Sequence, residues 1–430
     1  MLSYFHIKNF KSILDLRLDL SFAEGKAPAN YTNLPLLPFV GNYNDTKARY
    51  VPVMALYGAN ASGKTNILQA LFVFRRLLVF GANKNYHPNR LNPRYDTTSF
   101  EIGVFINNTH YDFYVEYNQK GIQQEILYKD NKACVVFEIK NQECFFDNIA
   151  TTEYTDSRLK EIYKVECLNE QQQQTVPFLT KIAKNYTGLN IDIVTARNAL
   201  VQGMEVYPEN NIPLSFVLDK LVGEKSVENI SEAFDNITSI LKKLDIDINK
   251  LTFDRKRKPI TDRNNVLKVM DENTTFYMPT DKDVIIDSIK SYHTDINGNE
   301  VIFNFNEESE GTVTLSGIIG MCLSALSKGK VLCIDELDKS LHSKLLVEIV
   351  KLFKDKRYNK HNAQLVFTAH NTDILDDDIM RISEVGFVDK TPKNGTTLKR
   401  VSDFDGKRNV TNFRKQYLDG IFSGIPYPYI

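Results

Sequence analysis

The sequence predicts an α/β fold with a β-rich N-terminal lobe, a parallel-sheet C-terminal lobe and a helical insertion between them. Three patterns indicate this: apolar and polar residues alternate near the N-terminus and after residue 98, helical periodicity runs from about 155 to 260, and strands alternate with helices after residue 300. We therefore expect an N-terminal part at 1–150, an insertion at 151–265 and a C-terminal part at 266–430.

The N-terminal part begins with two alternating apolar stretches within residues 2–22, which predict a hairpin that turns at Lys11 and Ser12. The apolar run 52–58 ends in glycine and precedes NILQALFVFRRLL, whose apolar residues have helical spacing. Strand, loop and helix are therefore expected in that order. Further strands are expected between Thr98 and Glu138.

The insertion shows helical periodicity near 157–185, 213–222 and 227–244. The C-terminal part then alternates between the two types of element: the expected strands are VIFNF, KVLCID and QLVFTAH, and the expected helices are GIIGMCLSALS and SKLLVEIVKLF. Such alternation predicts a parallel sheet flanked by helices.

The composition of the 430 residues is that of an ordinary soluble protein, with 42% hydrophobic and 25% charged residues. A net charge of -1 gives no general attraction to nucleic acid or to an anionic membrane, so any such binding would be local. The five cysteines form no C-x-x-C pair, which favours free thiols in a reducing compartment. No signal peptide and no run of about 18 apolar residues is found, so a cytoplasmic protein without a membrane partner is expected.

The strongest motif is GANASGKT, which matches the phosphate-loop pattern G-x-x-x-x-G-K-[ST] and lies between an expected strand and an expected helix. Backbone N–H groups of such a loop converge on phosphates, Lys64 would reach the terminal phosphates of ATP, and the Thr65 hydroxyl would bind Mg²⁺. The alternative is a glycine-rich turn that binds nothing. The expected ATP-binding residues are Gly58, Ala59, Asn60, Ala61, Ser62, Gly63, Lys64, Thr65 and Asn66.

A second motif, KVLCIDE, places Asp335 and Glu336 at the end of a buried strand. Asp335 would bind Mg²⁺, and Glu336 would orient or deprotonate the attacking water as a catalytic base. An acidic pair in this position can instead cap the next helix. His370 ends the next strand, where it could contact the γ-phosphate, although a lone histidine there can also be structural.

These elements, in this order, resemble the ABC-type ATPase heads of the SMC, Rad and RecF type. The opening IKNFKSI resembles the first strand and turn of those heads, and EESEGT resembles their signature motif, with Ser309 and Gly311 at its serine and glycine positions. DELDKSLH resembles Walker B running into the D-loop, with His342 in place of an aspartate. The ending YLDGIFSGIP is similar to the tail of RloA-like ATPases. The closest resemblance is to the RloA-like and PARIS AriA-like ATPases of anti-phage defence.

The resemblance implies an ATPase in which the phosphate loop of one chain and Ser309 and Gly311 of another enclose ATP, so self-association is expected. The insertion would stand where SMC proteins carry a coiled coil. A role in defence implies a separate effector protein. The alternative is a DNA-repair or DNA-maintenance ATPase that binds nucleic acid directly; a transporter subunit is a third and weaker interpretation. The glutamine of the Q-loop, sought between Ile122 and Gln174, is unassigned.

A basic run, Arg255 to Lys258, leaves nucleic acid open as a partner because four adjacent cations could contact phosphates. The alternative is a solvated loop between elements. No histidine cluster that would indicate a built-in nuclease is found.

Overall fold

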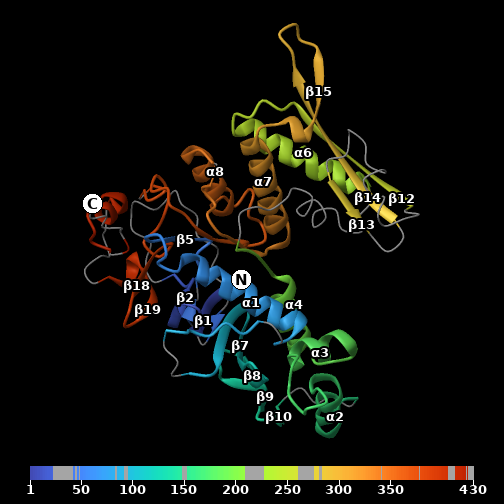
Figure 1. Ribbon diagram of the computed structural model, residues 1–430, viewed down its shortest axis with the longest axis vertical. Coiled ribbons are helices and arrows are strands. Elements are labelled where there is room, and N and C mark those ends of the chain that lie inside the picture. The colour runs from blue at the N-terminus through green and yellow to red at the C-terminus, as the bar shows by residue number, and fades with distance from the viewer. Residues whose placement is uncertain are drawn as a thin grey trace. The chain divides into compact units, whose positions relative to one another are not determined.

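The computed structural model describes residues 1–22, 42–43, 46–47, 49–82, 85–91, 95–147, 153–208, 227–259, 276–279, 283–339, 341–376, 378–404, 412–422 and 424. The chain divides into two compact units (Figure 1). The first unit comprises Met1–Asn210, Ala325–Asp338 and Val350–Ile430, and the second comprises Asn211–Ser324 and Lys339–Ile349. These units do not coincide with the three sequence ranges expected, because the second unit combines the end of the expected insertion with residues of the expected C-terminal part.

The first unit contains, among the described residues, one 13-stranded sheet in the order β10-β9-β8-β7-β6-β1-β2-β19-β18-β5-β17-β16-β11. The strands are β1 (Leu2–Phe10), β2 (Ile13–Asp19), β5 (Val53–Tyr57), β6 (Thr98–Ile106), β7 (Thr109–Asn118), β8 (Gly121–Lys129), β9 (Cys134–Lys140), β10 (Glu143–Phe146), β11 (Met204–Tyr207), β16 (Val331–Ile334), β17 (Gln364–Thr368), β18 (Val385–Thr391) and β19 (Gly395–Arg400). Two short strands, β3 (Asn42–Tyr43) and β4 (Thr46–Lys47), pair only with each other among the described residues.

The half of this sheet from β10 to β18 is antiparallel, and the half from β18 to β11 is parallel. The predicted hairpin of β1 and β2 is confirmed, and so is the parallel pairing of the expected strands KVLCID and QLVFTAH, which form β16 and β17. The expected strand VIFNF is not part of this parallel sheet, because most of its residues lie in β15 (Glu300–Asn304), an antiparallel strand of a second sheet. The β-rich part and the parallel part are therefore continuous. They join where β19 pairs with β2 and where β18 pairs with β5.

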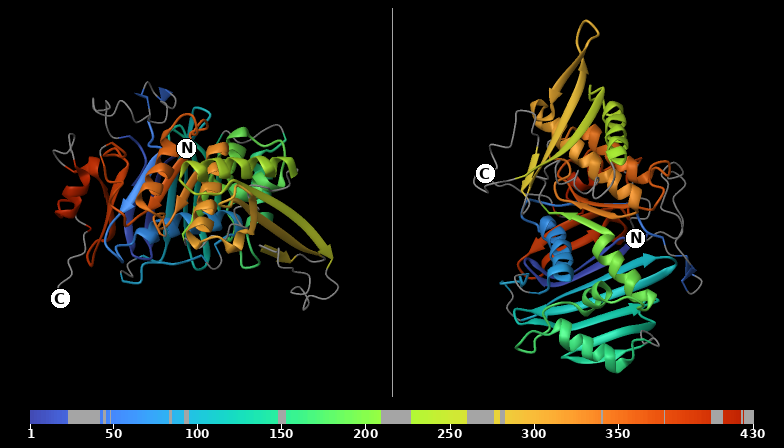
Figure 2. Two further views of the ribbon diagram at one scale, coloured as in Figure 1. Left: turned by 90° about the horizontal axis from the view of Figure 1, so that it is seen from above. Right: turned by 90° about the vertical axis from the view of Figure 1, so that its right-hand side faces the viewer.

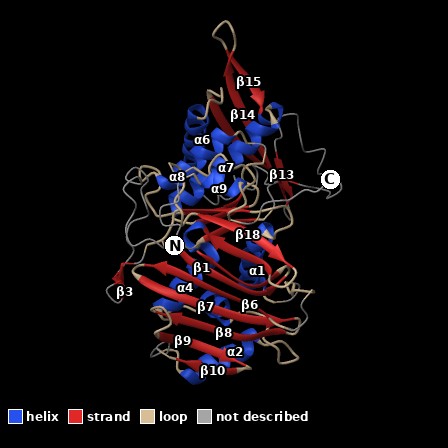
Figure 3. Ribbon diagram, turned by 90° about the vertical axis from the view of Figure 1, so that its left-hand side faces the viewer, coloured by secondary structure: helices blue, strands red, loops and turns tan. Residues whose placement is uncertain are grey.

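Helices α1 (Lys64–Phe80), α2 (Asp156–Cys167), α3 (Phe178–Asn185) and α4 (Ile191–Gln202) belong to this unit, as does the short α9 (Phe413–Leu418). Helix α1 contacts β1 and β11, and α4 contacts β6 and β11. Helices α1 to α4 lie on one face of the sheet (Figure 2), and Figure 3 shows the antiparallel strands from the other side. The helical segment expected near 157–185 is thus part of the first unit's core.

The second unit contains α6 (Val227–Lys243) and a sheet of β12 (Lys250–Pro259), β13 (Phe276–Pro279), β14 (Asp283–Thr294) and β15 (Glu300–Asn304), with β14 between its partners. The short 3-10 helix η3 (Phe305–Glu307) leads into α7 (Glu310–Lys328). Helices α7 and α8 (Ser343–Lys354) have residues in both units. The helix expected at 213–222 lies outside the described residues.

The expectation that 250–259 belongs to a helical insertion, or forms a loop, is wrong, because these residues form strand β12. Each of its residues pairs with β14. The Phe253 ring stacks on Phe234 of α6, with ring centroids 5.5 Å apart. The Arg255 guanidinium donates to Asp287 of β14 at 2.7 and 2.8 Å. An apolar contact and an ion pair therefore anchor a strand that is mostly charged.

Helix α7 is, among the described residues, the one helix long and apolar enough to cross a membrane, with a mean hydropathy of 1.2. Of the apolar stretch in this helix, 61% is buried inside the protein, as in the core helix of a globular domain.

The fold class is α/β, as expected, with the correction that the insertion includes strands. β17 lies between β5, which precedes the phosphate loop, and β16, which precedes the acidic pair. The ends of these three strands deliver the polar residues of the site.

Candidate functional site

The loop that follows β5 has a backbone that two glycines make possible. Gly58 has φ 154° and Gly63 has φ 104°, values that residues with a side chain rarely adopt. A Cβ atom on Gly58 would lie 2.2 Å from the Val388 carbonyl oxygen, and one on Gly63 would lie 2.2 Å from Thr396 Oγ1. The loop therefore packs directly on β18 and β19, and both positions require glycine.

A chain of hydrogen bonds connects the phosphate loop to the turn between β1 and β2 and to β19. Asn66 Nδ2 donates to Ser12 Oγ at 2.6 Å, the hydroxyls of Ser12 and Thr396 are 2.7 Å apart, and Thr396 Oγ1 donates to the Ser62 carbonyl at 2.9 Å. The sequence motif predicts Asn66 as an ATP-binding residue, and no motif indicates Thr396. The sequence predicts Ser12 only as part of a hairpin turn. The partners lie as many as 384 positions apart, so no local pattern could have linked them.

Lys64 is folded back into the loop. Its Nζ atom donates to the carbonyl oxygens of Gly58 at 2.6 Å and Ala59 at 3.1 Å, and only 6% of the residue is exposed. Burial lowers the pKa of the Lys64 ammonium, and nearby carboxylates, Asp335 first among them, act in the opposite direction. A phosphate group that enters the loop would give this ammonium an anionic partner in place of carbonyl dipoles.

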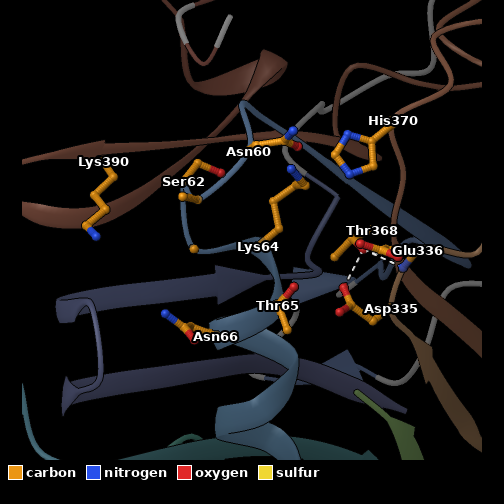
Figure 4. A pocket seen from close by; sticks show the side chains of 12 residues that line it. Asn60, Ser62, Lys64, Thr65, Asn66, Asp335, Glu336, Thr368, His370 and Lys390 are labelled. Atoms are coloured by element: carbon orange, nitrogen blue, oxygen red, sulfur yellow. Dashed lines mark hydrogen bonds between the residues drawn. The ribbon is translucent and has the colours of Figure 1, made fainter. Parts of the chain in front are cut away.

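The acidic pair is held by a residue of the neighbouring strand. Thr368, at the end of β17, donates its hydroxyl proton to Asp335 Oδ1 at 2.6 Å and accepts the Glu336 backbone N–H at 2.7 Å (Figure 4). Glu336 has φ 48°, in the left-handed region that few residues other than glycine adopt. Thr368 therefore fixes one side chain and one strained backbone, and sequence analysis did not single it out.

His370 follows β17 after one residue and is exposed. Its backbone N–H donates to Asp338 Oδ2 at 2.8 Å, and the Asn371 N–H donates to the same oxygen at 2.6 Å. The Tyr57 hydroxyl donates to the Asn371 carbonyl at 2.7 Å. Hydrogen bonds thus connect the segment that carries His370 to Asp338, which follows the acidic pair, and to β5, which precedes the phosphate loop.

The phosphate loop, the acidic pair, Thr368 and His370 border one cavity of about 310 Å³, shown in Figure 4. The residues that line it are Asn60, Ala61, Ser62, Gly63, Lys64, Thr65, Asn66, Asp335, Glu336, Thr368, His370 and Lys390. Ten of them, all except Thr368 and Lys390, were expected from the sequence. Lys390 lies near the end of β18, a strand that was not predicted from the sequence.

Four of the residues expected at the ATP site do not line this cavity: Gly58, Ala59, Ser309 and Gly311. Ser309 and Gly311 belong to the second unit, at the start of α7, so a role for them at the ATP of another chain stays a prediction. Gln174, one of the glutamines in the region searched for the Q-loop, is buried, donates to Glu125 at 2.8 Å and does not line the cavity. It therefore supports the core of the first unit.

The cavity suits a nucleotide phosphate with Mg²⁺. Ser62 lines the cavity, and its Oγ atom is buried without a hydrogen-bond partner in the protein. This hydroxyl is therefore available to a phosphate oxygen. The described residues contain no group of three acidic, histidine or cysteine side chains that could hold a metal alone. Mg²⁺ needs no such group, because one or two carboxylates and substrate phosphates commonly bind it. The Asp335 carboxylate and the Thr65 hydroxyl fit that donor set.

A family model described as "AAA domain, putative AbiEii toxin, Type IV TA system" matches residues 53–376. The chain belongs to this family. The matched residues run from the start of β5 past His370 and include the whole cavity except Lys390. The family and the site together identify a nucleotide-binding domain of the P-loop ATPase type. No curated protein matches the chain.

Among solved structures, 84 chains match. The SMC head domain from Thermotoga maritima is 14% identical, with a TM-score of 0.40, and the match covers 93% of this chain and 98% of that one. RecF, a recombination mediator protein, matches in its ATPrS form at 12% identity, with a TM-score of 0.38 and the same coverage. RecF-ATP matches at 14% identity, with a TM-score of 0.35, over 86% of this chain and 92% of that one.

Proposed function

We propose that this protein is a magnesium-dependent ATPase that acts as a nucleotide-driven switch. The observation that carries the proposal is the shared Thr368 hydroxyl, which places Asp335 and the Glu336 backbone together beside the phosphate loop. Bound Mg²⁺ would neutralise phosphate charge and polarise the γ-phosphate. Asp335 and Thr65 would hold the ion, and Lys64 would bind the terminal phosphates.

Glu336 and His370 would perform the chemical step. Both line the cavity, and Glu336 is the carboxylate that would orient the attacking water and accept its proton. His370 would contact the γ-phosphate, so that its segment responds to hydrolysis. Closure would require a second chain, whose Ser309 and Gly311 cover the same ATP. Self-association would therefore follow the nucleotide state.

We further propose that the switch serves anti-phage defence in the cytoplasm, as in the RloA-like and PARIS AriA-like ATPases that the sequence resembles. The family description, which names a toxin and a Type IV toxin–antitoxin system, is compatible with such a role. In this proposal Glu336 and His370 serve one nucleotide site. The toxic step is therefore assigned to a separate effector that the switch controls.

Lys64→Ala tests ATP binding directly. The variant should lose affinity for a fluorescent ATP analogue by at least roughly a hundredfold, because a charged hydrogen-bond partner of the phosphates is removed from a buried site. Lys160→Ala, at an exposed position on α2, is the matched control and should bind as the parent does. Unchanged affinity in folded Lys64→Ala would remove the phosphate-loop assignment.

The second candidate, a DNA-maintenance ATPase, is favoured by the basic side chains of β12, of which Lys256 and Arg257 are exposed and Lys258 is half-buried. Lys256, Arg257 and Lys258 can be changed to glutamine while Arg255 keeps its bond to Asp287. If this strand contacts DNA, the triple variant should retain ATPase activity and reduce the slope of log affinity against log salt by up to roughly three. A parent protein that does not bind DNA, or a variant with an unchanged slope, would leave β12 without this role.

A further inference from the structure

The residue before the signature serine is held by the central strand of the second unit. Glu308 Oε1 accepts a hydrogen bond from Ser291 Oγ at 2.5 Å and pairs with His293 Nε2 at 2.6 Å. Ser291 and His293 are two residues apart on β14, so their side chains leave the same face of the sheet. Ser291 is fully buried, and the His293 and Glu308 side chains are 24% and 13% exposed.

The neighbouring residues are fixed as well. Glu307 Oε2 accepts the Asn304 backbone N–H at 2.7 Å, which closes η3 onto the end of β15. Ser309 Oγ accepts the Thr312 N–H at 3.1 Å and so caps α7. Ser309 therefore lies between a helix that it caps and a carboxylate bound to β14. Its position depends on both anchors.

The Glu308 anchor is also accessible from one side. A cavity of about 450 Å³ is bordered by Glu307, Glu308, His293 and Phe303, among others. The His293 ring meets the Phe303 ring edge-on, with centroids 5.2 Å apart. A displacement of β15 relative to β14 would therefore move the His293 ring and, through its hydrogen bond, the Glu308 carboxylate.

We propose that Ser291 and His293 are positioning residues for Ser309 that act through Glu308, so that the sheet of the second unit regulates closure of the ATP site. This inference rests on the proposed role of Ser309 at the ATP of a second chain. Composite sites tolerate little error, because a misplacement of about 1 Å can cost roughly a hundredfold in rate. The signature serine therefore needs a rigid support, and β14 provides one.

The test uses full-length Glu336→Gln, in which the closed assembly should accumulate with ATP. Ser291→Ala and His293→Ala, combined, should weaken ATP-dependent assembly roughly tenfold or more, since two hydrogen bonds to a carboxylate are lost. Affinity of the single chain for a fluorescent ATP analogue should not change, because the phosphate loop is untouched. Glu308→Gln, which keeps the accepting oxygen, should assemble much as the parent does. Ser288→Ala, on the same strand, is the matched control.

Parent-like assembly of the double variant would overturn the inference, provided that Ser309→Arg abolishes assembly under the same conditions. Assembly that persists in Ser309→Arg would instead refute the proposed composite site. A double variant whose melting temperature and nucleotide affinity fall together with assembly would indicate a merely structural pair, and so would also overturn the inference. If the double variant does not fold, His293→Ala alone carries the test, because its ring is partly exposed.

Discussion

A single hydroxyl group serves both acidic residues of the site. Thr368 Oγ1 donates to the Asp335 carboxylate and accepts from the Glu336 N–H, and the residue is fully buried. Its one proton is committed to Asp335, which leaves its lone pairs for the Glu336 backbone. The same hydroxyl therefore orients the carboxylate that we propose binds Mg²⁺, and it holds the backbone φ of 48° at Glu336, the proposed catalytic base.

Thr368→Val tests this arrangement, because valine has the shape of threonine but no hydroxyl. The change leaves the Glu336 N–H and an Asp335 oxygen without their partner, which should cost about 1.5–3 kcal/mol of transition-state stabilisation. We expect kcat for phosphate release to fall roughly tenfold to a hundredfold. Thr368→Ser keeps the hydroxyl and should stay within a few-fold of the parent. A valine variant with the parental kcat would show that the hydroxyl does not position the base.

The residues that the sequence revealed and those that it missed differ in one respect. The loop residues and the pair of Asp335 and Glu336 are contiguous, so their spacing is visible in the chain. Thr368 acts on residues 32 and 33 positions away, and Thr396 acts on the loop from 334 positions away. Such partners are defined only when strands of the sheet come together.

At the scale of elements, β8 supplies the cap of α3. Glu125 is fully buried and accepts the N–H groups of Phe178 at 2.8 Å and Leu179 at 2.9 Å. The residue at the N-cap is Pro177, whose side chain makes no capping bond. A carboxylate from another strand therefore satisfies the first helical N–H groups, where its charge is also favoured by the helix dipole.

The pH dependence of stability should report this buried carboxylate. Burial raises the pKa of Glu125 from 4.5 to about 7, although the hydrogen bonds from Leu179 and Phe178 oppose the change. The folded state therefore binds the proton more tightly than the unfolded state. The contribution of Glu125 to stability is complete below pH 4.5 and is lost as the pH rises to about 7, by about 3 kcal/mol in all.

Urea denaturation of the parent and of Glu125→Gln at several pH values between 4 and 9 measures this contribution. Glutamine does not titrate, so the parent should lose about 3 kcal/mol of its free energy of unfolding relative to Glu125→Gln as the pH rises. Above pH 8 the difference between the two proteins should be constant. A difference that does not vary with pH would mean that the Glu125 carboxyl has the same pKa in both states.

Elements were predictable where periodicity was simple. The hairpin of β1 and β2, helix α1 and the buried strands β16 and β17 follow their apolar patterns. Strand β12 has no such apolar pattern. It forms because the guanidinium of Arg255 pairs with Asp287 on β14, and this pairing outweighs the polar composition of the segment. Strands β18 and β19 carry many polar residues, and their pairing with β5 and β2 decides their conformation.

At the scale of the whole molecule, the residues assigned to ATP are divided between the two units. The phosphate loop, Asp335, Glu336 and His370 belong to the first unit, whereas Ser309 belongs to the second. In the proposed switch, two chains bring the loop of one against Ser309 and Gly311 of the other. ATP would then favour the closed assembly, and hydrolysis would dissolve it, since a ligand shifts an equilibrium by its differential affinity for the two states.

Glu336→Gln separates binding from hydrolysis, because glutamine keeps the size and hydrogen bonding of the side chain but cannot accept the proton of the attacking water. The variant should bind ATP as the parent does, hydrolyse it at least roughly a hundredfold more slowly and accumulate in the closed assembly. Light scattering coupled to size-exclusion chromatography, with and without Mg²⁺-ATP, measures that assembly. Any oligomer that forms without nucleotide sets the baseline.

Ser309→Arg, added to Glu336→Gln, should return the protein to that baseline. The arginine places bulk and a misplaced cation where the γ-phosphate of the second chain must approach, and it leaves the loop residues of its own chain unchanged. ATP binding by the single chain should therefore persist while assembly is lost. An ATP-dependent assembly that is indifferent to Ser309→Arg, or parental hydrolysis in Glu336→Gln, would reduce the proposal to an ATP-binding protein without a composite site.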